Sequence, residues 1–131
     1  MSHSVDGRGG SHYSSTAVRD SAVYPGVRYT IMRPSLERRA EITSRVRRLL
    51  SELEFRAAGQ GLEDQLAAAE LESRIDREYI EWGLVRVENL SVDGEDCDAK
   101  ALVERGPEPL AREIAQAIRC ECRLGEEERK N

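Results

Sequence analysis

Cys97, Cys120 and Cys122 are the residues of this chain best suited to metal or redox chemistry. Cys120 and Cys122 are two positions apart, and on a helix such a pair points to different faces, so their thiols do not converge. A zinc site would also need a ligand from His3 or His12, and the usual ligand spacings are absent. We therefore expect no metal, no cofactor and no disulfide framework, which fits a reducing compartment.

Carboxylates gather in two places where they could bind calcium or transfer protons. The segment Asp93–Asp98 is acidic, but it lacks the twelve-residue spacing and terminal glutamate of an EF-hand loop, and a polar turn before a helix explains it better. Glu78 and Glu81 flank the region just before Trp82, yet general acid–base catalysis favours a histidine or similar partner, and no histidine follows His12. We expect no catalytic residues and no enzyme activity.

Arginine dominates one helical segment and forms the strongest local charge bias. The basic surface consists of Arg38, Arg39, Arg45, Arg47 and Arg48. Such a surface can contact phosphates or an acidic protein. Interleaved glutamates and the lack of stacking aromatic residues favour a solvated helix face instead. The net charge of −5 gives no bulk attraction to nucleic acid, so nucleic-acid binding is not expected.

Composition limits the chain to one small domain of its 131 residues. No apolar run approaches the roughly 20 residues of a membrane helix, and the polar start lacks a signal-peptide core. We expect a cytoplasmic protein with no membrane contact. Residues 1–26 are rich in serine, glycine and charge and predict a disordered leader, and residues 27–131 predict a single helical domain. Within it, the segment Val27–Met32 is expected to form an extended arm.

Two long amphipathic segments predict the main elements. Apolar residues recur at helical spacing over 34–58 and again over 62–88. Gly59 and Gly61 end the first helix, and the short loop between the segments predicts an antiparallel pair. Gly83 is costly inside a helix by about 1 kcal/mol relative to alanine, which indicates that a neighbour packs closely there.

The C-terminal third predicts one or two short helices. Residues 89–97 read as a loop around Asp93-Gly94, without a matching second strand. Asp98 is the expected cap of a helix over 99–105, and Pro109 opens the last helix. The predicted fold is therefore all-α, with three or four helices. The expected core consists of Ile42, Val46, Leu49, Leu53, Leu71, Ile75, Tyr79, Trp82, Ile114 and Ile118.

Several short motifs follow one another in order in the second half of the chain: Ile75-Asp76, Tyr79-Ile80-Glu81-Trp82-Gly83-Leu84, Leu90-Ser91-Val92-Asp93-Gly94, Gly106-Pro107 and Leu124-Gly125-Glu126-Glu127-Glu128-Arg129-Lys130-Asn131. This series is similar to that of small helical proteins encoded among phage and prophage tail genes, of the tail assembly chaperone kind. The resemblance covers roughly Arg33 to Asn131. The three cysteines and the polar leader depart from this pattern.

The resemblance implies a non-enzymatic protein that binds a tail-tube or tape-measure subunit during virion assembly, in the host cell cytoplasm. An apolar groove that holds an amphipathic partner helix would suit this role. The predicted partner-binding residues lie where the second helix meets its loop: Leu84, Val85, Val87 and Leu90.

Two other classes of function stay open at this point. One is a structural head–tail adaptor or ring-forming subunit, in which the Val27–Met32 arm pairs with the edge of a neighbouring copy. The other is a helical regulator that contacts DNA through the Arg38–Arg48 surface, with steep dependence on salt. The residues alone do not identify the partner or the oligomeric state.

Overall fold

The computed structural model describes the backbone of residues 10–130 and the side chains of residues 10–123. Residues 1–9 and residue 131 lie outside this description. In chain order the elements are β1 (Thr16–Asp20), β2 (Arg28–Met32), α1 (Leu36–Ala57), α2 (Leu62–Gly83), β3 (Leu84–Glu88), β4 (Ser91–Val92), β5 (Glu95–Asp96), α3 (Ala99–Arg105) and α4 (Glu108–Lys130). The protein is mixed α/β, so the all-α prediction is wrong.

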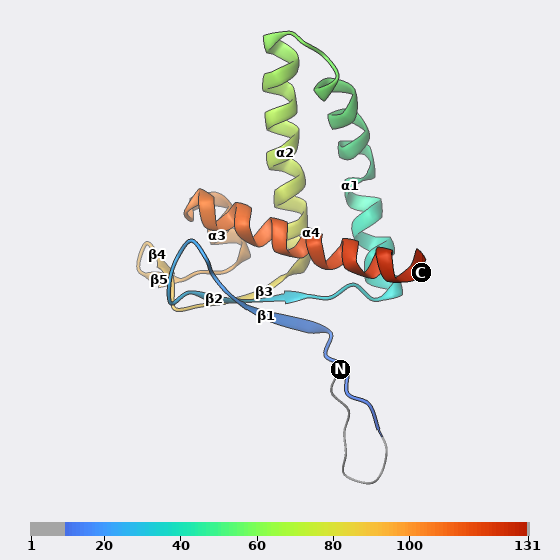
Figure 1. Cartoon of the computed structure of the whole chain (residues 1–131). Coiled ribbons are helices and arrows are strands. Elements are labelled where there is room, and N and C mark those ends of the chain that lie inside the picture. Colours follow the sequence, from blue (N-terminus) through green and yellow to red (C-terminus); the bar gives the residue numbers. More distant parts are fainter. Residues whose placement is uncertain (1–9, 131) are drawn as a thin grey trace.

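A three-stranded antiparallel sheet in the order β1-β2-β3 forms the base of the domain. The helix α4 lies across this sheet, and the α1–α2 hairpin projects away from it, as Figure 1 shows. The helix α2 continues directly into β3. The base of the hairpin is thereby joined to the sheet, while its tip extends beyond α4.

The N-terminal part of the sheet corrects two predictions. Val27–Met32 is not a free arm, because β2 is the central strand and pairs with β1 on one side and β3 on the other. The prediction of a disordered leader over residues 1–26 is wrong for β1, because Ala17 pairs with Ile31 and is buried. Residues 1–9 of this leader lie outside the described part of the chain. A strand of five residues buries too few side chains to show a clear alternating pattern in the sequence.

The second long helix is shorter than predicted. It ends at Gly83 rather than near residue 88, and the following residues form β3. A Cβ atom on Gly83 would lie 2.9 Å from Cγ2 of Ile118 on α4. The expectation of close packing at this glycine is therefore confirmed, and the neighbour is α4. β-Branched residues and pairing with β2 favour an extended chain after this point.

The C-terminal third contains a hairpin turn and a capped helix. Asp93 and Gly94 have φ angles of 53° and 85°, as a two-residue hairpin turn requires, and they join β4 to β5. The loop prediction for this segment missed that hairpin. The predicted helix over 99–105 is confirmed as α3, and the Asp98 carboxylate accepts a hydrogen bond of 2.8 Å from the Ala101 N–H.

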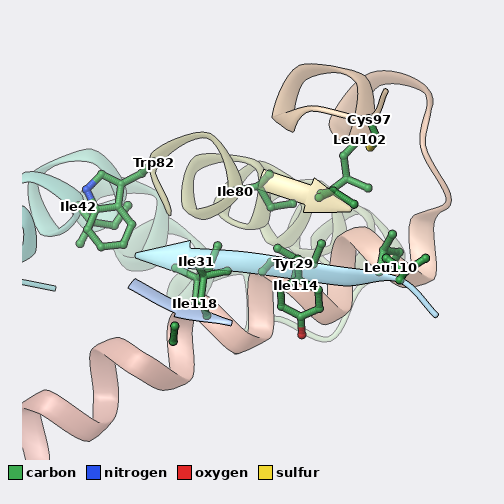
Figure 2. Packing of buried hydrophobic residues seen from close by; sticks show 14 of the residues in the cluster. Tyr29, Ile31, Ile42, Ile80, Trp82, Cys97, Leu102, Leu110, Ile114 and Ile118 are labelled. Atoms are coloured by element: carbon green, nitrogen blue, oxygen red, sulfur yellow. The ribbon is translucent and has the colours of Figure 1, made fainter. Parts of the chain in front are cut away.

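The core lies between the sheet, α4, α3 and the ends of α1 and α2 that are next to the sheet. Figure 2 shows Tyr29 and Ile31 of β2 beside Ile114 and Ile118 of α4. Of the predicted core, Leu49, Leu53 and Tyr79 are only half-buried. The others are buried: Ile42, Val46, Leu71, Ile75, Trp82, Ile114 and Ile118.

Trp82 belongs to this core and not to a surface. Its side chain is 4% exposed, and its Nε1–H donates a 3.0 Å hydrogen bond to Oε1 of Glu41. The guanidinium of Arg38 lies 5.0 Å from the centre of its ring, a cation–π contact. Arg38 also donates to the Trp82 carbonyl at 2.8 Å. These contacts fix the base of α1 against the junction of α2 and β3.

Candidate functional site

A basic groove between α1 and α4 is the strongest candidate for a binding site. We call it the α1–α4 groove; its cavity volume is about 400 Å³. The groove is lined by side chains of α1, α2 and α4: Arg39, Ile42, Thr43, Val46, Arg47, Leu50, Tyr79, Arg119, Cys122 and Arg123. No acidic residue is among them.

The floor of the groove follows from the amphipathic pattern of α1. Ile42 and Val46 are one helical turn apart and are buried at 2% exposure each. Leu50 continues the same row by a further turn and is 36% exposed, because α4 crosses α1 only near the base of the hairpin. The result is an apolar strip that is covered at one end and accessible to solvent at the other.

The rim on the α4 side consists of two arginines one turn apart. Arg119 lies with its guanidinium 5.5 Å from the centre of the Tyr79 ring, and its Nη1 is 3.5 Å from Oδ1 of Asp76. These contacts hold the Arg119 side chain along the groove wall. Arg123 contacts the neighbouring Cys120 sulfur at 3.5 Å and is otherwise exposed.

The rim on the α1 side is formed by Arg39 and Arg47. Arg47 is exposed and has no hydrogen bond or ion pair with any residue in the described part of the chain. A surface guanidinium with five donors and no carboxylate partner is suited to binding an incoming anionic group. The groove therefore presents positive charge on both of its long sides.

Two hydroxyl groups, those of Thr43 and Tyr79, add neutral polar contacts to the groove lining. Burial is the main factor that raises the pKa of Tyr79, and its interaction with Cys122 raises the pKa further. The phenol hence stays protonated at neutral pH and can donate or accept a hydrogen bond. Chemically, the groove can bind apolar side chains along its floor and anionic groups along its rims.

A second hollow, of about 280 Å³, lies between α2, α3 and α4 but carries balanced charge. Asp76 accepts a 2.9 Å hydrogen bond from Arg112, which also pairs with Glu108 at 2.9 Å. Burial raises the pKa of Asp76, although Arg119 and Arg112 act in the opposite direction. Since the charges of this hollow already pair with one another, it offers less to a charged ligand than the α1–α4 groove.

The predicted basic surface is divided among three places. Arg38 points towards Trp82, and Arg39 and Arg47 line the α1–α4 groove. Arg45 and Arg48 line a hollow on another side of α1, where Arg45 pairs with Glu78 at 3.0 Å, and Arg47 borders this hollow as well as the groove. The five arginines are thus distributed over three surroundings around α1, two of which share Arg47.

The structure adds to Arg39 and Arg47 the side chains of Arg119, Arg123 and Tyr79. This combination could not be predicted from the sequence, because α1 and the second half of α4 are separated along the chain by more than the length of the hairpin. The available signal was the row of Ile114, Ile118 and Cys122, which shows that α4 buries one face next to these arginines.

The four predicted partner-binding residues do not form a groove. Val87 is 7% exposed and belongs to the core, and Leu84 and Leu90 are half-buried against it. Only Val85 is exposed, at 47%. The reason is that this segment is a strand and not the end of a helix. Thr30 pairs with Arg86 and Ile31 with Leu84, so Val85 is the extra residue of a β-bulge and does not share a face with Val87.

The other chemistry-bearing residues lie apart from one another. Glu78 pairs with Arg45, whereas Glu81 pairs with Arg77. Cys97, Cys120 and Cys122 form no disulfide with one another, and among the residues described here no group of three or more His, Cys, Asp or Glu side chains could hold a metal ion. None of the helices within residues 10–130 is both long enough and apolar enough to span a membrane.

No known protein family matches this chain, and neither a curated protein nor a solved structure does. The geometry of the α1–α4 groove is therefore the basis for a functional proposal.

Proposed function

We propose that this protein is a non-enzymatic protein-binding module, and that the α1–α4 groove receives a segment of its partner. The observation that carries the proposal is an apolar floor, accessible at Leu50, between arginine rims on which no acidic residue lies among the described side chains of residues 10–123. Binding sites for protein segments combine an apolar strip with polar groups that fix orientation. Leu50 at the open end of the groove is 36% exposed and lies on α1, within the hairpin that projects away from the sheet (Figure 1).

Within this proposal, the phage tail assembly chaperone stays a prediction from the motif resemblance. It implies a tail-tube or tape-measure partner and the host cell cytoplasm as the compartment. The resemblance also implied an all-helical fold, whereas the sheet contributes a large part of the core. The proposal of a binding groove does not depend on this family.

The structure gives less support to the two alternative functions than to a protein-binding groove. A ring-forming or head–tail adaptor subunit was expected to pair through the Val27–Met32 arm, but both edges of β2 already pair within the chain. Assembly through that arm is therefore not proposed. A DNA-binding regulator stays an alternative prediction, and the division of the arginines between separate sides of α1 gives it less support than a single basic face would.

Site-specific photo-crosslinking in cells that express the full chain would test the proposed function. A photoreactive residue placed at position 50 or 43 should crosslink to one protein partner, and the same residue at position 86, on β3, should not. The partner is then purified and mixed with the wild-type protein and with Leu50→Asp. Co-elution on size exclusion should be lost in the variant, since a buried carboxylate opposes apolar contact.

A tail-tube or tape-measure fragment is the first partner to include in this mixing experiment. Co-elution of such a fragment would support the tail-assembly interpretation as well. Equal crosslinking from positions 50 and 86, or co-elution that Leu50→Asp leaves unchanged, would count against the groove as the binding site.

A further inference from the structure

We infer that the segment bound by the α1–α4 groove is an acidic amphipathic helix of about three turns. This inference rests on the proposed function and specifies the chemistry of the partner. It follows from the length of the groove, the distribution of apolar side chains along its floor and the charge on its two rims.

The shape of the groove favours a helical occupant. Its α1 side extends from Arg39 to Leu50, a distance of roughly 16 Å at 1.5 Å per residue, which corresponds to about three helical turns. Ile42, Val46 and Leu50 repeat every four residues along this length; the first two are buried, and Leu50 at the open end presents the apolar surface that a side chain of another helix can contact. The α1–α2 hairpin would gain a third helix beside α1, as in a small helical bundle.

The charge of the groove favours an acidic occupant. Arg39 and Arg47 stand on the α1 side and Arg119 and Arg123 on the α4 side, so that carboxylates on either flank of a bound helix would meet a guanidinium. Bringing a basic segment to the same place would set like charges against each other. The net charge of −5 shows that this basic region is local, since the rest of the chain carries an excess of acid.

Arg47 contributes most clearly to recognition. Its side chain has no partner within the described residues, so binding a carboxylate breaks no ion pair there. Arg119, in contrast, is already oriented by Tyr79 and Asp76. One arginine is therefore pre-positioned, and the other supplies a guanidinium whose hydrogen bonds are all available to the partner.

Fluorescence anisotropy with designed peptides tests this inference on the full chain. The probe is a labelled helical peptide of about 14 residues, near the minimum length for a helix in water, with leucines at spacings of three and four and glutamates on both flanks. One control peptide replaces every glutamate with lysine, and a second scrambles the order at constant composition. Saturable binding is expected for the acidic amphipathic peptide alone, and it should weaken between about 50 and about 300 mM salt.

Matched variants locate the binding. Arg47→Glu and Arg123→Glu should each weaken the acidic peptide at least about fivefold, because they place like charges at the rim. Leu50→Ser should weaken it with little effect on the fold, since this side chain is 36% exposed. Arg86→Glu is the control: it makes the same change of charge at an exposed position on β3, outside both hollows that Arg47 lines. Its affinity should equal that of the wild type.

Equal binding of the lysine or scrambled peptide, or an equal loss in Arg86→Glu, would overturn the inference. A duplex DNA that displaces the peptide and depends on the same arginines would assign the groove to nucleic acid and would overturn it too. If a crosslinked protein partner binds but the acidic peptide does not, this inference fails and the proposed function stands. If neither binds, both fail.

Discussion

Replacing Gly83 with alanine should destabilise the protein, although alanine is the better helix former. The new methyl carbon would lie 2.9 Å from Cγ2 and 3.2 Å from Cδ1 of Ile118, well inside the usual contact distance. Ile118 is fully buried, so its side chain has no free space into which to move. Overpacking of this kind costs about 1–3 kcal/mol, and the gain in helix propensity is at most about 1 kcal/mol. We expect a net loss of about 1–2 kcal/mol.

Urea unfolding followed by Trp82 fluorescence measures this loss. The midpoint should fall while the slope of the unfolding free energy against urea stays constant. Gly10→Ala is the control, because no atom lies within 4 Å of a Cβ atom at that position. The double variant with Ile118→Ala should be less destabilised than the sum of the single variants, by about 1–2 kcal/mol, since truncation makes room for the methyl group. Strict additivity, or a Gly83→Ala protein as stable as the wild type, would refute the packing described for α2 and α4.

Three further predictions concern buried polar groups. Thr30→Val should raise the free energy of unfolding by about 1 kcal/mol in urea titrations, because the Thr30 hydroxyl is buried without a hydrogen-bond partner among the described residues; a loss of stability would contradict this. Burial raises the pKa of Tyr29 to about 12, whereas the pKa in the unfolded chain is near 10. The free energy of unfolding therefore falls as pH rises between these two values. Tyr29→Phe should show less of this alkaline loss by circular dichroism, and an identical alkaline transition would oppose the assignment. Burial also raises the pKa of Asp76, so its ionisation above about pH 4 disfavours folding. The stability of Asp76→Asn relative to wild type should therefore increase from pH 3 to 7, and a decrease would mean that Arg112 and Arg119 dominate instead.

The positions of the helices could be predicted from the sequence because their signals are local, although the prediction of short C-terminal helices was wrong for α4, which has 23 residues. The apolar periodicity of α1 and the Asp98 cap of α3 each lie within a few turns of chain, and both predictions agree with the structure. The reduced propensity at Gly83 likewise indicated a close neighbour. These features depend on residues whose spacing along the chain already determines where their side chains point.

The sheet could not be predicted because its signals are distributed over distant segments. β1, β2 and β3 are each five residues long, and β3 follows α2 without a loop. The apolar residues of Leu84–Glu88 fit a helical stripe as well as a strand, and only pairing with β2 decides between them. The same limit applies to the α1–α4 groove, since one of its walls comes from α4 and the other from α1.

An NMR titration of the isotope-labelled full chain with the acidic amphipathic peptide tests the central claim most directly. Amide signals of residues 39–50 and 119–123 should shift together and saturate at one peptide per chain, while signals of β1 and β3 stay in place. Shifts centred on the sheet, or a spectrum that the peptide leaves unchanged, would contradict the assignment of the α1–α4 groove as the binding surface.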